Sequence, residues 1–103
     1  MYVSLFHKSY NNQHLQEVAE EMKKLGAPKI RAIWSEVYGQ WMAVEGCHRL
    51  RAAAQLGIAP VIVDVTNKKT ITIQQDGENV KVKVSELTEE LESNLWKAEA
   101  LNF

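Results

Sequence analysis

The residues best suited to carry chemistry lie together at positions 45–49, with the sequence Glu-Gly-Cys-His-Arg. A short apolar run of strand length precedes them, and good helix formers follow as far as Gly57. The sequence therefore predicts that Gly46 lies where a strand turns into a helix. A glycine there lets a ligand approach the backbone closely, and the unpaired amides of the first helical turn attract anions. We predict a phosphate-binding loop at this point of the chain.

Each residue of this loop has an expected part in holding a phosphate. Gly46 permits the close approach, and the backbone amides of Cys47 and His48 bind phosphate oxygens. Arg49 neutralises charge with a fork of charged donors. Arg51, half a turn further along, is expected to support the loop or the ligand.

Two side chains of the same stretch are candidate catalytic residues. The helix N-terminus, His48 and Arg49 would stabilise the thiolate of Cys47, which makes a nucleophilic or redox role reasonable. Glu45 could hold Mg²⁺ or act as a base, and it could equally cap the helix or pair with Arg51. No metal site is expected from Cys47 and His48, because adjacent side chains point in different directions.

The loop resembles the signature turn of the ParB/sulfiredoxin superfamily, in which a Gly-x-x-Arg turn opens a helix and contacts nucleotide phosphates. Gly46 and Arg49 match that turn, and Arg51 with the following alanine matches the Arg-Ala of ParB-like domains. Cys47 stands at the position of the catalytic cysteine of sulfiredoxins. The resemblance covers about residues 2–64. It implies a nucleoside triphosphate ligand, ATP or CTP, together with Mg²⁺.

Three functions are compatible with this resemblance. The first is a ParB-like nucleotide-binding module within a DNA-associated system. The second is a sulfiredoxin-like enzyme that uses ATP and Cys47 to reduce a cysteine sulfinic acid on another protein. The third is a kinase of a small metabolite, similar to the related free-serine kinases, with Glu45 in an active role. Sulfiredoxins have glycine at the position of Glu45, and a lysine and two hydroxyl residues where this chain has His14, Glu17 and Glu21.

Composition limits the partners of the chain. With 12 Lys and Arg against 13 Asp and Glu, the net charge of −1 predicts that DNA is bound only weakly or through a partner. Cys47 is the only cysteine, and no apolar run is long enough for a signal peptide or a membrane span. We therefore expect a cytoplasmic domain with no membrane contact. Nucleotide is the expected ligand, and a protein partner or a homodimer is open.

The elements that must position the loop make a small α+β domain with a mixed sheet flanked by helices. Residues 2–6 predict a first strand, and a helix with an apolar stripe from Leu15 to Leu25 follows, capped by Asn11 or Asn12. Two strands at 30–34 and 41–44 form a hairpin that leads to the loop. After the loop helix, the β-branched run at 61–65 predicts a strand buried on both faces.

The C-terminal third has a different pattern, but the whole chain, residues 1–103, is expected to form one domain. Residues 1–66 make the core that resembles the superfamily, and residues 67–103 add a hairpin and a helix. Two alternating strands flank the turn at Asp76 and Gly77. Ser85 is the expected cap of a final helix that docks on its own domain or on a second copy. Its apolar stripe contains Leu87, Leu91, Leu95, Ala98 and Leu101.

Overall fold

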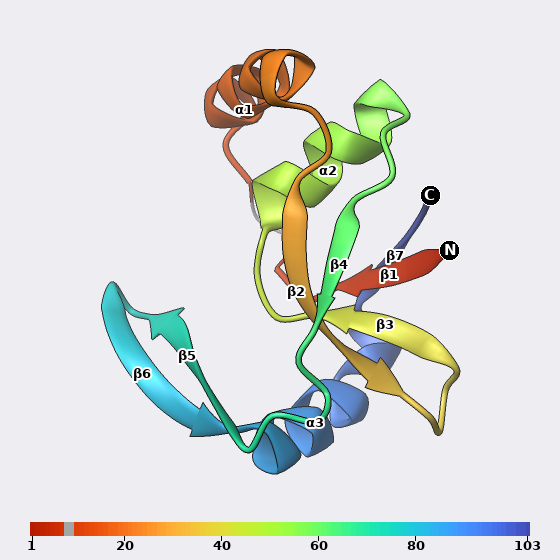
Figure 1. The fold of residues 1–103 in the computed structure, drawn as a ribbon, viewed down its shortest axis with the longest axis vertical. Helices are drawn as coiled ribbons and strands as arrows, with labels where there is room; N and C mark the ends of the chain where they lie inside the picture. Colours follow the sequence, from red (N-terminus) through yellow and green to blue (C-terminus); the bar gives the residue numbers. More distant parts are fainter. Residues whose placement is uncertain (8–9) are drawn as a thin grey trace.

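A computed structural model of the chain describes residues 1–7 and 10–103. These residues form the predicted α+β domain, with a mixed sheet, flanking helices and a C-terminal hairpin and helix (Figure 1). In chain order the elements are β1 (Tyr2–Leu5), α1 (Asn12–Leu25), β2 (Lys29–Ser35), β3 (Gln40–Ala43), α2 (Cys47–Leu56), β4 (Val61–Asp64), β5 (Thr70–Gln75), β6 (Glu78–Lys83), α3 (Val84–Ser93), the 3₁₀ helix η1 (Leu95–Lys97) and β7 (Glu99–Asn102).

Five of the strands form one sheet in the order β4-β2-β3-β1-β7. β1 runs parallel to β3 and β2 parallel to β4, while β2–β3 and β1–β7 are antiparallel. The predicted hairpin before the loop is confirmed, because β2 and β3 pair from Ala32↔Ala43 to Ser35↔Gln40. β5 and β6 form a separate two-stranded sheet that projects from the rest of the domain (Figure 1).

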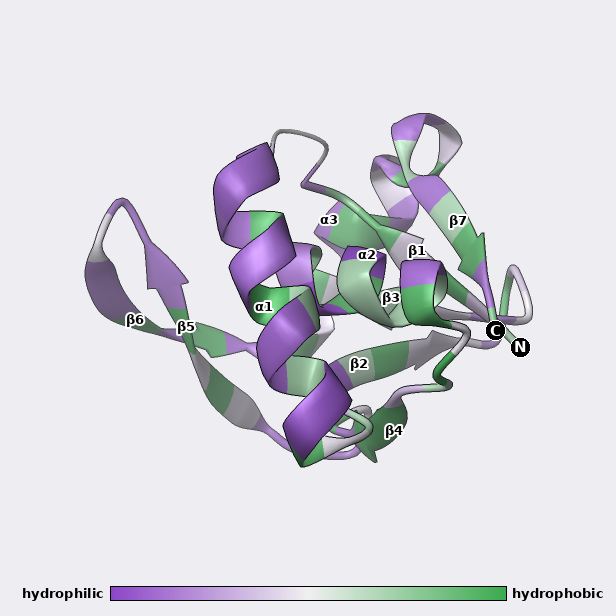
Figure 2. Ribbon diagram, turned by 90° about the horizontal axis from the view of Figure 1, so that it is seen from above, coloured by the Kyte–Doolittle hydropathy of each residue, from purple (hydrophilic) through white to green (hydrophobic). Residues whose placement is uncertain are grey.

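Alternate residues of β2 point to two different layers of the core. Ile30 packs with Val3 and Leu50 on the side of α2, whereas Ile33 packs with Met42 in the cluster that α3 covers. α1 lies beside α2, and the side of α1 seen in Figure 2 is mostly hydrophilic. The sheet is thus covered by α1 and α2 on one face and by α3 on the other. The interface between α1 and α2 contains Leu15, Met22, Ala52 and Ala53.

α1 begins and ends as its sequence predicts. Asn11 is the N-cap, and its side-chain oxygen accepts a hydrogen bond from the amide of His14 at 3.1 Å. Gly26 ends the helix with a φ of 84°. The hairpin signal at Asp76 and Gly77 is also confirmed, since both have positive φ, 52° and 78°, as a two-residue type I′ turn requires.

The prediction that residues 61–65 form a strand buried on both faces is wrong. Among the described residues β4 is an edge strand that pairs only with β2, and Val61 and Val63 are 49% and 37% exposed. β-branched residues favour any extended strand, so their presence did not indicate how many neighbours the strand would have.

The prediction of one long final helix is also wrong. α3 begins at Val84, with Lys83 as N-cap in place of Ser85, and it ends at Ser93. Leu95 belongs to η1, and Leu101 belongs to β7 opposite Val3 of β1. A strand at this point gives β1 a second hydrogen-bonded neighbour, which a continued helix could not provide.

Candidate functional site

The loop between β3 and α2 has the predicted strand-to-helix geometry. Gly46 is the N-cap of α2 with φ 90° and ψ 35°, in the left-handed region, and the amide of Leu50 donates to its carbonyl at 2.8 Å. A Cβ at this position would lie 2.6 Å from Cδ1 of Ile30. The site is therefore restricted to glycine by conformation and by space. Because glycine has no side chain to cap the helix, the first-turn amides face the loop without competition from a cap side chain.

A cleft of about 530 Å³ opens beside this loop. Its volume lies in the range of pockets that hold small-molecule ligands. The loop forms one wall, the ends of β1 and β3 form the floor, and β5, α3 and η1 form the opposite wall. The polar and charged side chains around the cleft are His7, Glu45, Gln74, Gln75, Glu90, Asn94 and Lys97.

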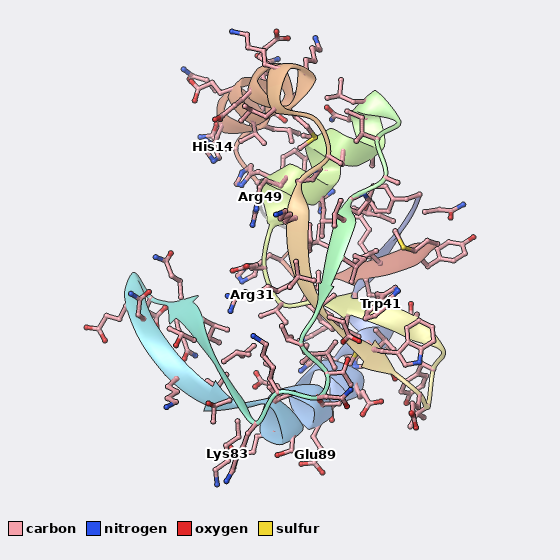
Figure 3. The ribbon with its side chains drawn as sticks, in the orientation of Figure 1. His14, Arg31, Trp41, Arg49, Lys83 and Glu89 are labelled. Carbon is pink, nitrogen blue, oxygen red and sulfur yellow. The ribbon has the colours of Figure 1, made fainter. Side chains whose placement is uncertain are left out.

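Arg49 flanks the loop on the side of α1, outside the lining of the cleft. Its Nη1 donates to the carbonyl of Lys29 at 3.0 Å, and its Nη2 lies 3.6 Å from the position of a Cβ on Gly46. Figure 3 shows Arg49 and Arg31 on the same side of β2, with Arg31 nearer to the β5–β6 hairpin. Arg49 thus places a positive charge against the loop backbone, beside the start of α2.

Glu45 pairs with Arg31, and the expected alternative of a pair with Arg51 is wrong. Nε and Nη2 of Arg31 donate to the two carboxylate oxygens of Glu45 at 2.8 Å each. The hydrogen bond from Arg31 holds the pKa of Glu45 below its usual range. Nη1 of Arg31 also donates to the carbonyl of Thr72, so the same side chain ties the hairpin to β2. A carboxylate held in this way is ionised at neutral pH and is a weak base.

Arg51 joins α2 to β7 and lies outside the cleft. Its Nη2 is 2.7 Å from Oε2 of Glu99, and its guanidinium lies 4.5 Å from the centre of the Tyr10 ring. Burial works against the charge of Arg51, but hydrogen bonds with Glu99 and Cys47 outweigh burial and raise its pKa. Arg51 therefore supports the helix that carries the loop.

His48 turns toward α1 instead of the cleft. Its Nε2 accepts a hydrogen bond from the amide of Asn11 at 3.2 Å, and its ring meets His14 edge-on with centroids 4.5 Å apart. Burial, followed by the charges of His14 and Arg51, lowers the pKa of His48. The ring is therefore neutral at pH 7, and His48 can offer a phosphate its backbone amide but no side-chain charge.

Cys47 is half-buried and lines the cleft. Its thiol donates to the carbonyl of His7, with Sγ and O 3.2 Å apart. The structure thus brings Glu45, Gly46 and Cys47 to the cleft, while the side chains of His48, Arg49 and Arg51 point elsewhere.

Sequence reasoning missed the part that Arg31 plays and the cleft residues of the C-terminal third. The signal for Arg31 was present in the predicted hairpin, because the register of β2 and β3 brings the amide of Val44 within 3.0 Å of the carbonyl of Arg31. Glu45 is the next residue after Val44 in the chain, so this register also brings Glu45 close to Arg31. Gln74 and Lys97 carried no such signal, since their position depends on where the β5–β6 hairpin and η1 lie relative to the loop.

No group of three or more His, Cys, Asp or Glu side chains in residues 1–7 and 10–103 could hold a metal ion. In the same part of the chain, every helix is too short or too polar to cross a bilayer.

The family model of the ParB N-terminal domain matches residues 6–95. This match extends beyond the residues 2–64 that carry the sequence resemblance, and it includes the β5–β6 hairpin and α3. No curated protein and no solved structure matches the chain.

Proposed function

The chain belongs to the family of ParB N-terminal domains, and from this premise we propose that it binds a nucleotide, with the phosphates on the loop at residues 46–49. One observation carries the proposal. Gly46 starts α2 in a left-handed conformation that leaves no room for a side chain, and the amides of the first helical turn follow directly. This arrangement presents backbone donors and the positive end of a helix to an anion.

The surroundings of the loop support a nucleotide over a free phosphate. The cleft of about 530 Å³ extends from Gly46 to the hairpin and α3, which leaves space for a sugar and a base. Gln74, Gln75 and Asn94 offer amide groups on the far wall, and Lys97 offers a positive charge. The ion pair with Arg31 compensates the charge of Glu45, which would otherwise repel phosphates.

The proposed ligand is ATP or CTP with Mg²⁺. Mg²⁺ is commonly held by substrate phosphates and one or two carboxylates. In this proposal the ion arrives with the triphosphate and needs no preformed protein site.

A thermal-shift screen of ATP, ADP, CTP and GTP, each with and without Mg²⁺, tests the proposal. A ligand that binds only the folded state adds about 2.7 kcal/mol to the free energy of unfolding when its concentration is 100 times Kd. The melting temperature rises as a consequence. Arg49→Ala removes the positive charge that lies against the backbone of Gly46, and it should lose up to about 1 kcal/mol of nucleotide affinity, the usual value for an ion pair in contact with solvent. Lys24→Ala, on the last turn of α1, is the matched control and should bind as the wild type does. Equal affinity in both variants would remove the loop from consideration.

A second candidate function, a sulfiredoxin-like reductase, is favoured by the position of the Cys47 thiol at the same cleft. Cys47→Ser should then abolish the ATP-dependent reduction of a cysteine sulfinic acid and leave nucleotide binding intact. A kinase with Glu45 as base is less well supported, because Arg31 occupies both carboxylate oxygens.

A further inference from the structure

Four aromatic side chains line a groove of about 580 Å³ at the end of the sheet where β1 and β3 begin. We call it the aromatic groove; its aromatic residues are Tyr2, Trp34, Tyr38 and Trp41. The proposed nucleotide cleft lies at the other end of these parallel strands, so the two features are separate. The side chains of Tyr2 and Tyr38 are more than half exposed, at 56% and 57%. Large aromatic groups gathered on one surface indicate an interaction site.

The floor of the aromatic groove is held in place. Trp34 and Trp41 are opposite each other on β2 and β3, and their rings meet edge-on with centroids 5.1 Å apart. The amide of Trp34 donates to Oγ1 of Thr66 at 2.9 Å. A partner would therefore meet a preformed surface and would lose little affinity to its ordering.

The aromatic groove borders a negatively charged surface on α3. Tyr38 belongs to both, because it also lines a hollow with Glu86, Glu89, Glu90 and Glu92. Ser35 fixes the β2–β3 turn against α3, since its Oγ donates to Glu92 at 2.6 Å and accepts from the amide of Tyr38 at 3.2 Å. Within residues 1–7 and 10–103, the four carboxylates form no ion pair. We call these four side chains the acidic rim.

We propose that the aromatic groove binds an extended, arginine-bearing segment of a protein partner. A guanidinium stacks on Tyr and Trp faces, and its fork of donors also matches a carboxylate, so one arginine can use the groove and the acidic rim together. Arginine and aromatic residues are the side chains most enriched at the centres of protein interfaces.

Two other occupants fit the surface less well. Exposed aromatic rings can stack on the bases of single-stranded nucleic acid, but the acidic rim would repel its phosphates. A second copy of this chain has its arginines engaged elsewhere: Arg31 with Glu45, Arg49 with the carbonyl of Lys29, and Arg51 with Glu99. The negative charge of the acidic rim therefore favours a cationic segment. Because the arginines of this chain are engaged, that segment is expected to come from a different protein.

Fluorescence anisotropy with labelled hexa-arginine, hexa-lysine and oligo-dT probes tests this proposal on the whole chain. Hexa-arginine should bind most tightly, and Tyr38→Ala should weaken it about fivefold, the value of an exposed cation–π contact. Tyr38 is an exposed turn residue, so the variant should fold. Trp96→Ala is the matched control, because Trp96 is 84% exposed and lies outside the groove. It should bind hexa-arginine as the wild type does.

The part played by charge is tested separately with two double variants. One carries Glu86→Gln and Glu89→Gln in the acidic rim, and the other carries Glu17→Gln and Glu21→Gln on α1. Both change the net charge by the same amount. Only the first pair should weaken hexa-arginine binding. Equal losses in the two pairs, or hexa-lysine binding as tightly as hexa-arginine, would reduce the effect to overall charge and overturn the proposal. Tighter binding of oligo-dT, or self-association that Tyr38→Ala abolishes, would overturn it in favour of nucleic acid or a second copy.

Discussion

At Gly46 a single methyl group would meet two separate obstacles. The first is the left-handed backbone, which costs a residue with a Cβ about 1–2 kcal/mol. The second is the contact of 2.6 Å with Cδ1 of Ile30. We expect Gly46→Ala to lower the free energy of unfolding by more than Gly57→Ala, since Gly57 also has a positive φ but no atom of a residue packed against it lies within 4 Å of its Cβ position.

Urea denaturation of the two variants measures the difference. Adding Ile30→Val to Gly46→Ala removes the Cδ1 atom and should recover part of the stability, although Ile30→Val alone costs about 0.5–1.5 kcal/mol. If Gly46→Ala and Gly57→Ala are equally stable, the close contact with Ile30 does not restrict the loop.

The ion pair of Glu45 and Arg31 gives a pH-dependent prediction. Because its folded pKa is lowered, Glu45 contributes stability above the pKa of an unfolded glutamate, about 4.3, and loses it as the pH falls through the lower folded value. Glu45→Gln should therefore cost about 1 kcal/mol at pH 7, a small value because solvent screens these partly exposed side chains. This cost should shrink as the pH falls below about 4.3 and through the lower folded pKa, because the carboxylate is then protonated in both states.

Chemical denaturation at pH 7, 5 and 3 checks this dependence, with Glu36→Gln in the exposed β2–β3 turn as control. A cost that persists undiminished at pH 3 would show that Glu45 acts by packing and not by charge.

At this scale the sequence was sufficient for the backbone of the site and insufficient for its side chains. The change from strand to helix at Gly46 follows from residue types alone. The partners of Glu45, Arg49 and Arg51 do not, because a long side chain can reach several partners and the choice depends on neighbouring strands. Glu99, the partner of Arg51, is 48 residues away in the chain.

Among the elements, local patterns predicted those whose neighbours are close in sequence. α1 has its own cap and stop residues, and the turn of the β5–β6 hairpin has Asp76 and Gly77. Two predictions were wrong: β4 was expected to be buried on both faces, and the residues of β7 were expected to belong to the final helix. In both, the outcome depends on a partner strand elsewhere in the chain, β2 for one and β1 for the other. Propensity does not contain that information.

The assignment of β7 can be tested with one half-buried side chain. Leu101 pairs with Val3 and packs on the cluster around Leu50, so Leu101→Ala should cost about 1–2 kcal/mol, less than a fully buried leucine. Trp96→Ala, at an exposed position of η1, should stay within about 0.5 kcal/mol of the wild type. Thermal unfolding of both proteins gives the comparison. Loss of stability in Trp96→Ala alone would contradict the strand.

On the scale of the whole molecule, the parallel strands β1 and β3 separate two surfaces of different character. Their C-terminal ends lead to the cleft, where Gly46 and the first turn of α2 favour anions. Their N-terminal ends lie at the aromatic groove, which borders the acidic rim, and Glu90 of the rim also lines the cleft. The net charge is −1, but the charges are unevenly distributed along the chain. Residues 1–60 carry seven Lys and Arg and five Asp and Glu, whereas residues 61–103 carry five Lys and Arg and eight Asp and Glu.

This distribution predicts weak binding to DNA by the chain alone. Non-specific affinity comes from the release of counterions by surplus Lys and Arg, and proteins that have this surplus bind duplex DNA with Kd of about 10⁻⁴–10⁻⁶ M at physiological salt. We expect a Kd above about 10⁻⁴ M for this chain in an anisotropy titration with duplex DNA. The variant with Glu86, Glu89, Glu90 and Glu92 all changed to glutamine should bind more tightly, with a steeper dependence on salt, because the repulsion of the acidic rim is removed. Micromolar binding by the wild type at physiological salt would show that the positive charges of residues 1–60 act as a DNA surface despite the acidic helix α3.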